Sequence, residues 1–137
     1  MSYLLDTNVL SELRRKTPHP GVVDWVASKS AASLYLSVLT LGELRKGIEG
    51  VADAGRRQTL VDWLENELPH FFAGRLLPID LAVADRWGRL LAAAGRPLPA
   101  IDSLLCATAA QHGLRMVTRN TRDFAALGVE VINPWDA

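Results

Sequence analysis

The stretch SYLLDTNVLSEL, residues 2–13, contains the change of pattern that decides the fold. A short apolar run at residues 3–5 stops at the polar Asp-Thr-Asn of residues 6–8, and apolar residues then recur at helical spacing. This pattern predicts a short buried strand that ends at Asp6 and a helix that begins directly after it. Two roles fit Asp6 at this junction: an N-cap of the helix, or a carboxylate held at the end of a strand to do chemistry.

The same alternation of strands and helices continues along the chain. We expect strands over residues 2–5, 33–37, 75–80, 115–120 and 129–132. We expect helices over residues 7–15, 22–29, 38–47, 52–72, 81–91, 100–111 and 122–127. Strands that alternate with helices form a parallel sheet covered on both faces. We therefore expect one α/β domain over residues 1–137, with a central, mostly parallel sheet flanked by helices.

Composition excludes several classes of protein. The one cysteine, Cys106, excludes an internal disulfide framework, and its apolar surroundings in the sequence favour a small buried hydrophobe. We find no signal peptide, and no apolar run approaches the ~18 residues of a membrane span. These features predict a cytoplasmic protein without a membrane segment. The net charge of zero does not by itself favour nucleic acid as a partner.

Four acidic residues fall where predicted strands end or predicted helices begin. Asp6 ends the first strand, and Glu43 lies in the helix after the second. Asp102 is in the first turn of a later helix, and Asp123 lies just past the fourth strand. Each has an ordinary explanation on its own, as a helix cap, a solvated helix residue, a charge at a helix dipole or a partner of a neighbouring arginine. Because ligands of parallel sheets bind at the carboxyl ends of the strands, all four could converge at one edge.

Carboxylates gathered at one site raise each other's pKa, and a hard cation is the usual means of keeping them ionised. Mg²⁺ or Mn²⁺ takes oxygen ligands, and Mg²⁺ also binds substrate phosphates. Such a cation can activate water and stabilise charge on a phosphodiester, so we predict metal-dependent phosphodiester hydrolysis. His19, His70 and His112 lack zinc-like spacing. Asn8, in place of a second aspartate, argues against an aspartyl-phosphate phosphatase.

Four segments resemble, in order and spacing, the acidic blocks of PIN-domain ribonucleases. They are LLDTNVLSEL (4–13), TLGELRKGI (40–48), PAIDSLLCATAAQHGL (99–114) and VTRNTRDF (117–124). The most similar subgroup is the VapC and FitB-like toxins of prokaryotic toxin–antitoxin pairs, which the segment GVEVINPW (128–135) also resembles. The resemblance covers residues 2–135 and implies the PIN-like three-layer fold.

Carried over residue by residue, the resemblance implies a set of catalytic, metal-binding carboxylates. These are Asp6, Glu43, Asp102 and Asp123. Family members often have two acids in the block after the last core strand, and Asn120 stands here in place of the first. This departure leaves the occupancy of a second metal open. Polar neighbours that would orient ligands or water are Thr7, Asn8, Thr118 and Asn120.

Basic residues close in sequence to the acidic blocks are candidates for contacts with RNA phosphates. The candidates are Arg14, Arg15, Lys46 and Arg119, followed by Lys16, Arg45 and Arg122. A solvated surface explains each of them equally well on its own.

The resemblance implies a Mg²⁺- or Mn²⁺-dependent endoribonuclease that acts as the toxin of a type II toxin–antitoxin pair. It further implies an RNA substrate such as transfer RNA, a homodimer, and a cognate antitoxin protein that covers the active site and carries the DNA binding. Two alternatives stay open. One is a catalytically weak PIN module that binds RNA or protein, which Asn120 supports. The other is a different phosphohydrolase on a doubly wound sheet.

Overall fold

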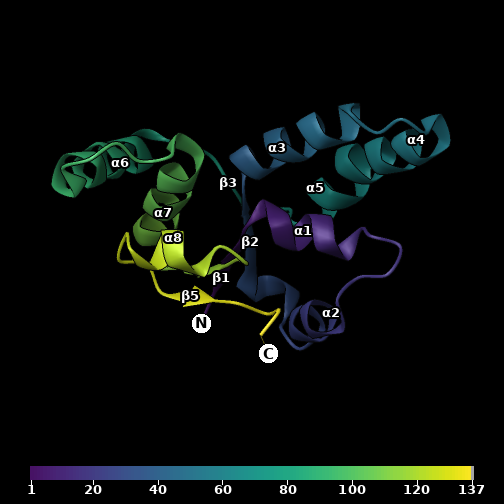
Figure 1. The fold of residues 1–137 in the computed structure, drawn as a ribbon, viewed down its shortest axis with the longest axis horizontal. Helices are drawn as coiled ribbons and strands as arrows, with labels where there is room; N and C mark the ends of the chain where they lie inside the picture. Colours follow the sequence, from purple (N-terminus) through teal and green to yellow (C-terminus); the bar gives the residue numbers. More distant parts are fainter. Residues whose placement is uncertain (137) are drawn as a thin grey trace.

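Helices lie on both sides of a central sheet in the computed structural model, which describes residues 1–136 (Figure 1). Within these residues the sheet has five strands in the order β3-β2-β1-β4-β5, and each neighbouring pair is parallel. The strands are β1 Tyr3–Leu5, β2 Leu34–Ser37, β3 Leu76–Leu77, β4 Arg115–Val117 and β5 Val131–Ile132. The predicted α/β class with a covered parallel sheet is therefore confirmed.

The helices follow the predicted order along the chain. The described α-helices are α1 Thr7–Leu13, α2 Pro20–Ala27, α3 Val38–Glu49, α4 Ala54–Asp62, α5 Leu68–Phe71, α6 Leu81–Ala94, α7 Ala100–His112 and α8 Thr121–Ala125. Two shorter turns are the 3-10 turn η1, Ala31–Ser33, and the π-helical turn η2, Trp63–Glu67. Figure 1 shows α6, α7 and α8 on one side of the sheet and α1, α2, α4 and α5 on the other. No helix of the described chain has the length and apolar character needed to cross a membrane.

The predicted continuous helix over residues 52–72 is wrong, because the structure divides it into α4, η2 and α5. At the end of η2 the Leu68 N–H bonds to the Trp63 carbonyl, five residues earlier. Pro69 has no N–H and its ring would collide with the Glu65 carbonyl, so the turn before it widens.

The predicted strand over residues 75–80 is shortened to β3. Pro78 follows β3 directly and has no N–H to donate to a sheet. Asp80 leaves the strand altogether, since its side chain accepts a hydrogen bond from the Val83 N–H at 3.0 Å and caps α6.

The core consists of two apolar clusters, one on each face of the sheet. Side chains of β1 alternate between them: Tyr3 and Leu5 pack in the cluster that contains α1, and Leu4 packs in the cluster that contains α7. All three are buried, as expected for the central strand of a sheet covered on both faces. The central position of β1 places the residue after it, Asp6, in the middle of the sheet's carboxyl edge.

Candidate active site

Asp6 follows β1 and is held from two directions. Its own N–H bonds to the Val117 carbonyl at the end of β4, at 2.9 Å. Its Oδ1 accepts a hydrogen bond from the Thr7 N–H at 2.8 Å, which makes it the N-cap of α1. Its Oδ2 accepts from the Thr118 hydroxyl at 2.7 Å. Asp6 thus caps the helix and also presents a fixed carboxylate at the end of a strand.

The predicted polar neighbours form a hydrogen-bond network around this carboxylate. The Thr118 hydroxyl accepts from the Asn120 N–H at 3.0 Å and from the Asn8 side-chain amide at 3.2 Å. The Thr7 hydroxyl donates to Glu43 Oε1 at 2.5 Å, so it connects α1 to α3. Because each hydroxyl and amide has a defined partner, the orientations of the Asp6 and Glu43 carboxylates are fixed before any ligand binds.

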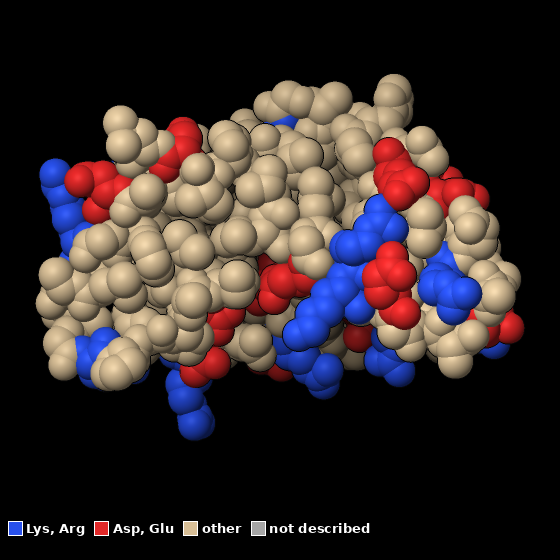
Figure 2. Space-filling model, turned by 90° about the horizontal axis from the view of Figure 1, so that it is seen from above, with Lys and Arg blue, Asp and Glu red and all other residues tan. Residues whose placement is uncertain are grey.

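A cavity of about 460 Å³ opens at the carboxyl end of the sheet and brings three predicted carboxylates together. They are Asp6, Glu43 from α3 and Asp102 from the first turn of α7. Asp123 lies in α8, is exposed, and does not line the cavity. Figure 2 shows acidic side chains near the middle of the upper face, beside a run of basic side chains.

The carboxylates perturb one another. Burial is the main cause of a raised pKa at Asp6; the charges of Asp102 and Glu43 raise it further, and the Thr118 and Thr7 hydrogen bonds oppose the rise. Burial is also the main cause of the raised pKa at Asp102, followed by the charges of Asp123 and Glu43. Asp123 therefore acts on the site through its charge, although it does not line the cavity.

The donor set fits a hydrated cation. Within residues 1–136, no group of three or more His, Cys, Asp or Glu side chains is close enough to enclose a metal ion. Mg²⁺ does not need such a cage, because it is usually bound by one or two carboxylates and keeps several waters. A cavity that holds Asp6, Glu43 and Asp102 with room for water suits Mg²⁺ or Mn²⁺, and its oxygen donors do not favour a soft metal.

The predicted basic residues divide into two groups. Arg15 and Arg119 line the cavity with the carboxylates. Arg14 lies instead over the Trp63 ring, 5.1 Å from its centroid. Lys46 lines a separate, mostly apolar hollow along α3. The structure therefore does not bring Arg14 and Lys46 into the cavity.

Glu12 and Trp135 line the cavity, and sequence reasoning missed both as site residues. Glu12 is buried and accepts hydrogen bonds from the His19 N–H at 3.0 Å and from Arg15 at 3.4 Å. The His19 hydrogen bond is the largest cause of its lowered pKa, and a hydrogen bond from the Trp135 side chain adds to it. The spacing of Glu12 four residues after Asn8 was an available signal, because it places both on one face of α1. No comparable signal identifies Trp135.

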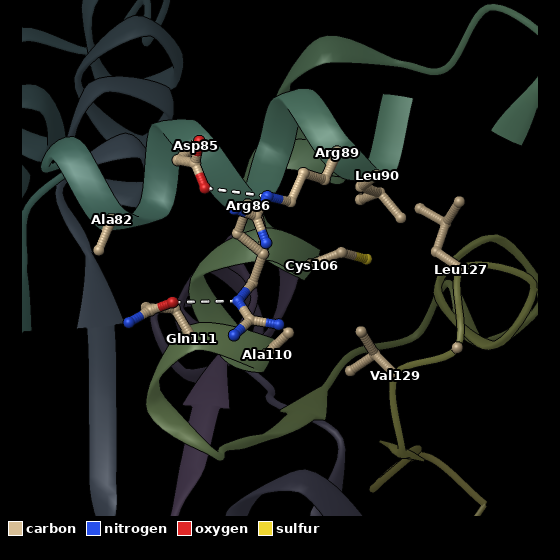
Figure 3. Close-up of a pocket in the computed structure, with 12 residues that line it drawn as sticks. Ala82, Asp85, Arg86, Arg89, Leu90, Cys106, Ala110, Gln111, Leu127 and Val129 are labelled. Atoms are coloured by element: carbon tan, nitrogen blue, oxygen red, sulfur yellow. Dashed lines mark hydrogen bonds and ion pairs between the residues drawn. The ribbon is translucent and has the colours of Figure 1, made fainter. Parts of the chain in front are cut away.

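A second cavity, of about 520 Å³, lies between α6, α7 and the segment after α8 (Figure 3). Its charged side chains have partners within the cavity: Arg89 forms an ion pair with Asp85 at 3.1 Å, and Arg86 donates a hydrogen bond to the uncharged Gln111 at 3.0 Å. The Cys106 thiol is buried there, and burial raises its pKa to about 12. The predicted buried role of Cys106 is confirmed, and its thiol is protonated at neutral pH and unsuited to nucleophilic catalysis.

Comparison with known proteins agrees with this geometry. A PIN-domain family model matches residues 3–130. The VapC ribonuclease Y4jK of Sinorhizobium fredii is 38% identical, with 97% of each chain covered. Toxin FitB of Neisseria gonorrhoeae is 40% identical, with 96% of this chain and 97% of that protein covered.

Two solved structures contain chains with the same fold. The crystal structure of FitAcB from Neisseria gonorrhoeae contains a chain with a TM-score of 0.91 and 38% identity, covering 98% of this chain and 99% of that one. A structure of FitAB bound to a DNA fragment contains a chain with a TM-score of 0.89 and 37% identity, covering 97% and 95%.

Proposed function

Because this chain belongs to the PIN-domain family, we propose that it is a Mg²⁺- or Mn²⁺-dependent endoribonuclease and the toxin of a type II toxin–antitoxin pair. The observation that carries the proposal is the convergence of Asp6, Glu43 and Asp102 in one cavity at the carboxyl end of the sheet. The names of two relatives, a VapC ribonuclease and a toxin, support the activity and its role.

Asp6, Asp102 and Glu43 are the residues that would hold the cation, directly or through water. When bound, a divalent cation supplies an activated water and stabilises charge on the phosphodiester. The protein's own contribution is to hold the carboxylates in place: Thr118 and the Thr7 N–H fix Asp6, and the Thr7 hydroxyl fixes Glu43. The charge of Asp123 raises the pKa of Asp102 and so adds to the attraction of the site for a cation.

A cognate antitoxin is the partner that fits this function, and we place DNA binding on that partner. The DNA-bound FitAB structure supports the assignment, and the net charge of zero gives this chain no general attraction for a duplex. We also expect a homodimer, and RNA such as transfer RNA as substrate. The reduced, buried Cys106 and an RNA substrate are consistent with a cytoplasmic location.

Cleavage of RNA by the purified chain tests the proposal directly. We expect cleavage with Mg²⁺ or Mn²⁺, none in EDTA, and a loss of at least about 100-fold in Asp6→Asn and Asp102→Asn, since each removes a charge from the cation site. Asp24→Asn, an exposed carboxylate of α2, is the matched control and should retain full activity.

Cleavage that survives both EDTA and the two substitutions would contradict the proposal. Thermal unfolding with and without Mg²⁺ separates it from a catalytically weak module. A cation that binds only the folded state at 100 times its Kd stabilises that state by about 2.7 kcal/mol. A protein that neither cleaves RNA nor is stabilised by Mg²⁺ would be the weak module.

A further inference from the structure

The segment after β5 packs against α1 and α2 beside the cavity. The Trp135 N–H donates to Asn133 Oδ1 at 2.9 Å, which closes the turn. The Trp135 side chain packs against the core cluster that contains α1, and it lines the cavity together with Glu12 of α1. A Cβ atom on Gly21 would lie 2.8 Å from the Pro134 carbonyl oxygen, so this close approach requires glycine in α2. The Trp135 ring is therefore held in a defined place.

Arg119 lies on this ring. Its guanidinium carbon is 5.4 Å from the Trp135 ring centroid, and its side chain lines the cavity that contains Asp6 and Asp102. A guanidinium that stacks on an aromatic face keeps the N–H groups at its edge available to an anion.

Arg119 differs in its charge partners from Arg15, the other arginine that lines the cavity. Arg15 pairs with Glu12 at 3.4 Å, and Arg45 pairs with Glu65 at 2.5 Å. For Arg119, no carboxylate of residues 1–136 lies within 4.0 Å. The exposed Arg119 side chain, which forms no ion pair within residues 1–136, thus brings a positive charge to a cavity lined by four carboxylates.

We propose that Arg119 binds a backbone phosphate of the RNA strand, and that Trp135 is the positioning residue that holds its guanidinium at the cavity. The inference rests on the proposed ribonuclease function, because it takes RNA as the ligand of this site. A strand phosphate that approaches Asp6 and Asp102 meets like charge, and Arg119 offsets that repulsion. The fixed indole reduces the rotamer entropy that Arg119 loses when it binds.

RNA binding in EDTA tests this without any dependence on cleavage. The probe is a fluorescent single-stranded RNA, bound to the full chain over a range of KCl concentrations and checked by gel to be intact. Arg119→Gln should make the plot of log affinity against log salt shallower by about 0.7, the loss of one phosphate contact, and weaken binding about fivefold near 0.1 M salt. Arg119→Lys, which keeps the charge, should retain the slope, and Arg89→Gln, in the second cavity, should leave slope and affinity unchanged.

Variants of Trp135 test the positioning role separately. Trp135→Leu should weaken binding, whereas Trp135→Phe, which keeps an aromatic face, should largely restore it. In an Arg119→Gln background, Trp135→Leu should cost nothing further, since the two residues act as a unit. Melting temperatures show whether each variant is folded.

The outcomes distinguish the two claims. If Arg119→Gln has the same salt slope and the same RNA affinity as the parent, the proposed phosphate contact is overturned. The positioning role is overturned if Trp135→Leu weakens RNA binding as much in the Arg119→Gln background as in the parent. It is also overturned if Trp135→Phe weakens RNA binding as much as Trp135→Leu does. A parent chain that binds no RNA at all overturns the proposed function, and this inference with it.

Discussion

The two oxygens of the Asp6 carboxylate have different hydrogen-bond partners. One accepts from the first N–H of α1 and the other from Thr118 after β4, so the side chain joins a helix start to a strand end. A carboxylate has more lone pairs than these two bonds use, which leaves capacity for a cation. Asp102 is less constrained, because its side chain forms no hydrogen bond within residues 1–136. The Asp102 charge therefore contributes to binding a ligand rather than to stabilising the fold.

Asp102→Asn should therefore abolish cleavage and yet raise the melting temperature in EDTA at pH 7.5. Because burial and neighbouring acids raise the pKa of Asp102, the folded state is penalised at pH values where the side chain is ionised. The gain should be on the order of a few degrees at pH 7.5 and should vanish near pH 4, below which Asp102 is protonated in both states. Thermal unfolding at the two pH values measures it, and a gain that is equal at both would contradict this explanation.

At the scale of elements, the short helix α1 both packs against the core and lines the cavity. Its seven residues bury Val9 and Leu10 against the core, while Thr7, Asn8 and Glu12 face the cavity. Intrinsic helix propensity does not stabilise a helix of this length, so contacts with the rest of the protein must stabilise α1. Glu12 provides several of them, since it binds the loop before α2, Arg15 and the segment after β5.

Glu12→Ala should lower the free energy of unfolding by about 1–3 kcal/mol, because it removes the buried carboxylate that accepts a hydrogen bond from the His19 N–H. The pKa of Glu12 is lowered in the folded state, so this contribution is present above the ordinary glutamate pKa and is lost as the pH falls through the lowered value. Urea unfolding at pH 7 and pH 4 should show the difference shrinking. Glu49→Ala, which removes an exposed ion pair, should cost less than about 0.5 kcal/mol. An equal effect of both variants would contradict the role given to Glu12.

The elements also show what could be predicted from the sequence. Local periodicity correctly predicted strand and helix types and the strand end before Asp6, since those signals are contained in neighbouring residues. The fourth strand was predicted over residues 115–120, but β4 ends at Val117, so Thr118 and Asn120 lie after it. The π-helical turn before Pro69 was not predicted, because helical periodicity continues through it. Trp135 was missed because it reaches the cavity by packing against α1, far away in the sequence, and no local pattern reports such a contact. Asp123 was assigned to the site, and its charge does act there, although its side chain does not line the cavity.

At the scale of the whole molecule, charge is unevenly distributed. Figure 2 shows a broad uncharged area on the left of the upper face, in the direction of α6, and charged side chains to its right. Val38 and Leu81, the first residues of α3 and α6, are exposed apolar side chains. They follow adjacent strands, β2 and β3, so both helices start from the same edge of the sheet. We expect these two exposed apolar side chains to contribute to the contact surface for a second copy of the chain.

We expect Leu81→Asp to convert a homodimer to a monomer without loss of folding. Leu81 is 87% exposed, so the substitution removes no core contact, and an acid in the first turn of α6 is favourable to the helix dipole. Light scattering coupled to size exclusion measures the mass, and circular dichroism confirms the fold. Arg96→Asp, on the exposed loop after α6, is the control and should remain dimeric. A parent chain that is monomeric at all concentrations would contradict the expectation.

The central position of β1 has a consequence for how the protein is made. Asp6 leaves the ribosome 112 positions before its partner Thr118, and β1 cannot be paired on both edges until β4 has been synthesised. A nascent chain that ends before Thr118 therefore has β1 paired on one edge at most, and its carboxylates are not yet assembled into the cavity. The cavity that we propose as the ribonuclease site is therefore complete only after the segment from Thr118 to Trp135 has left the ribosome.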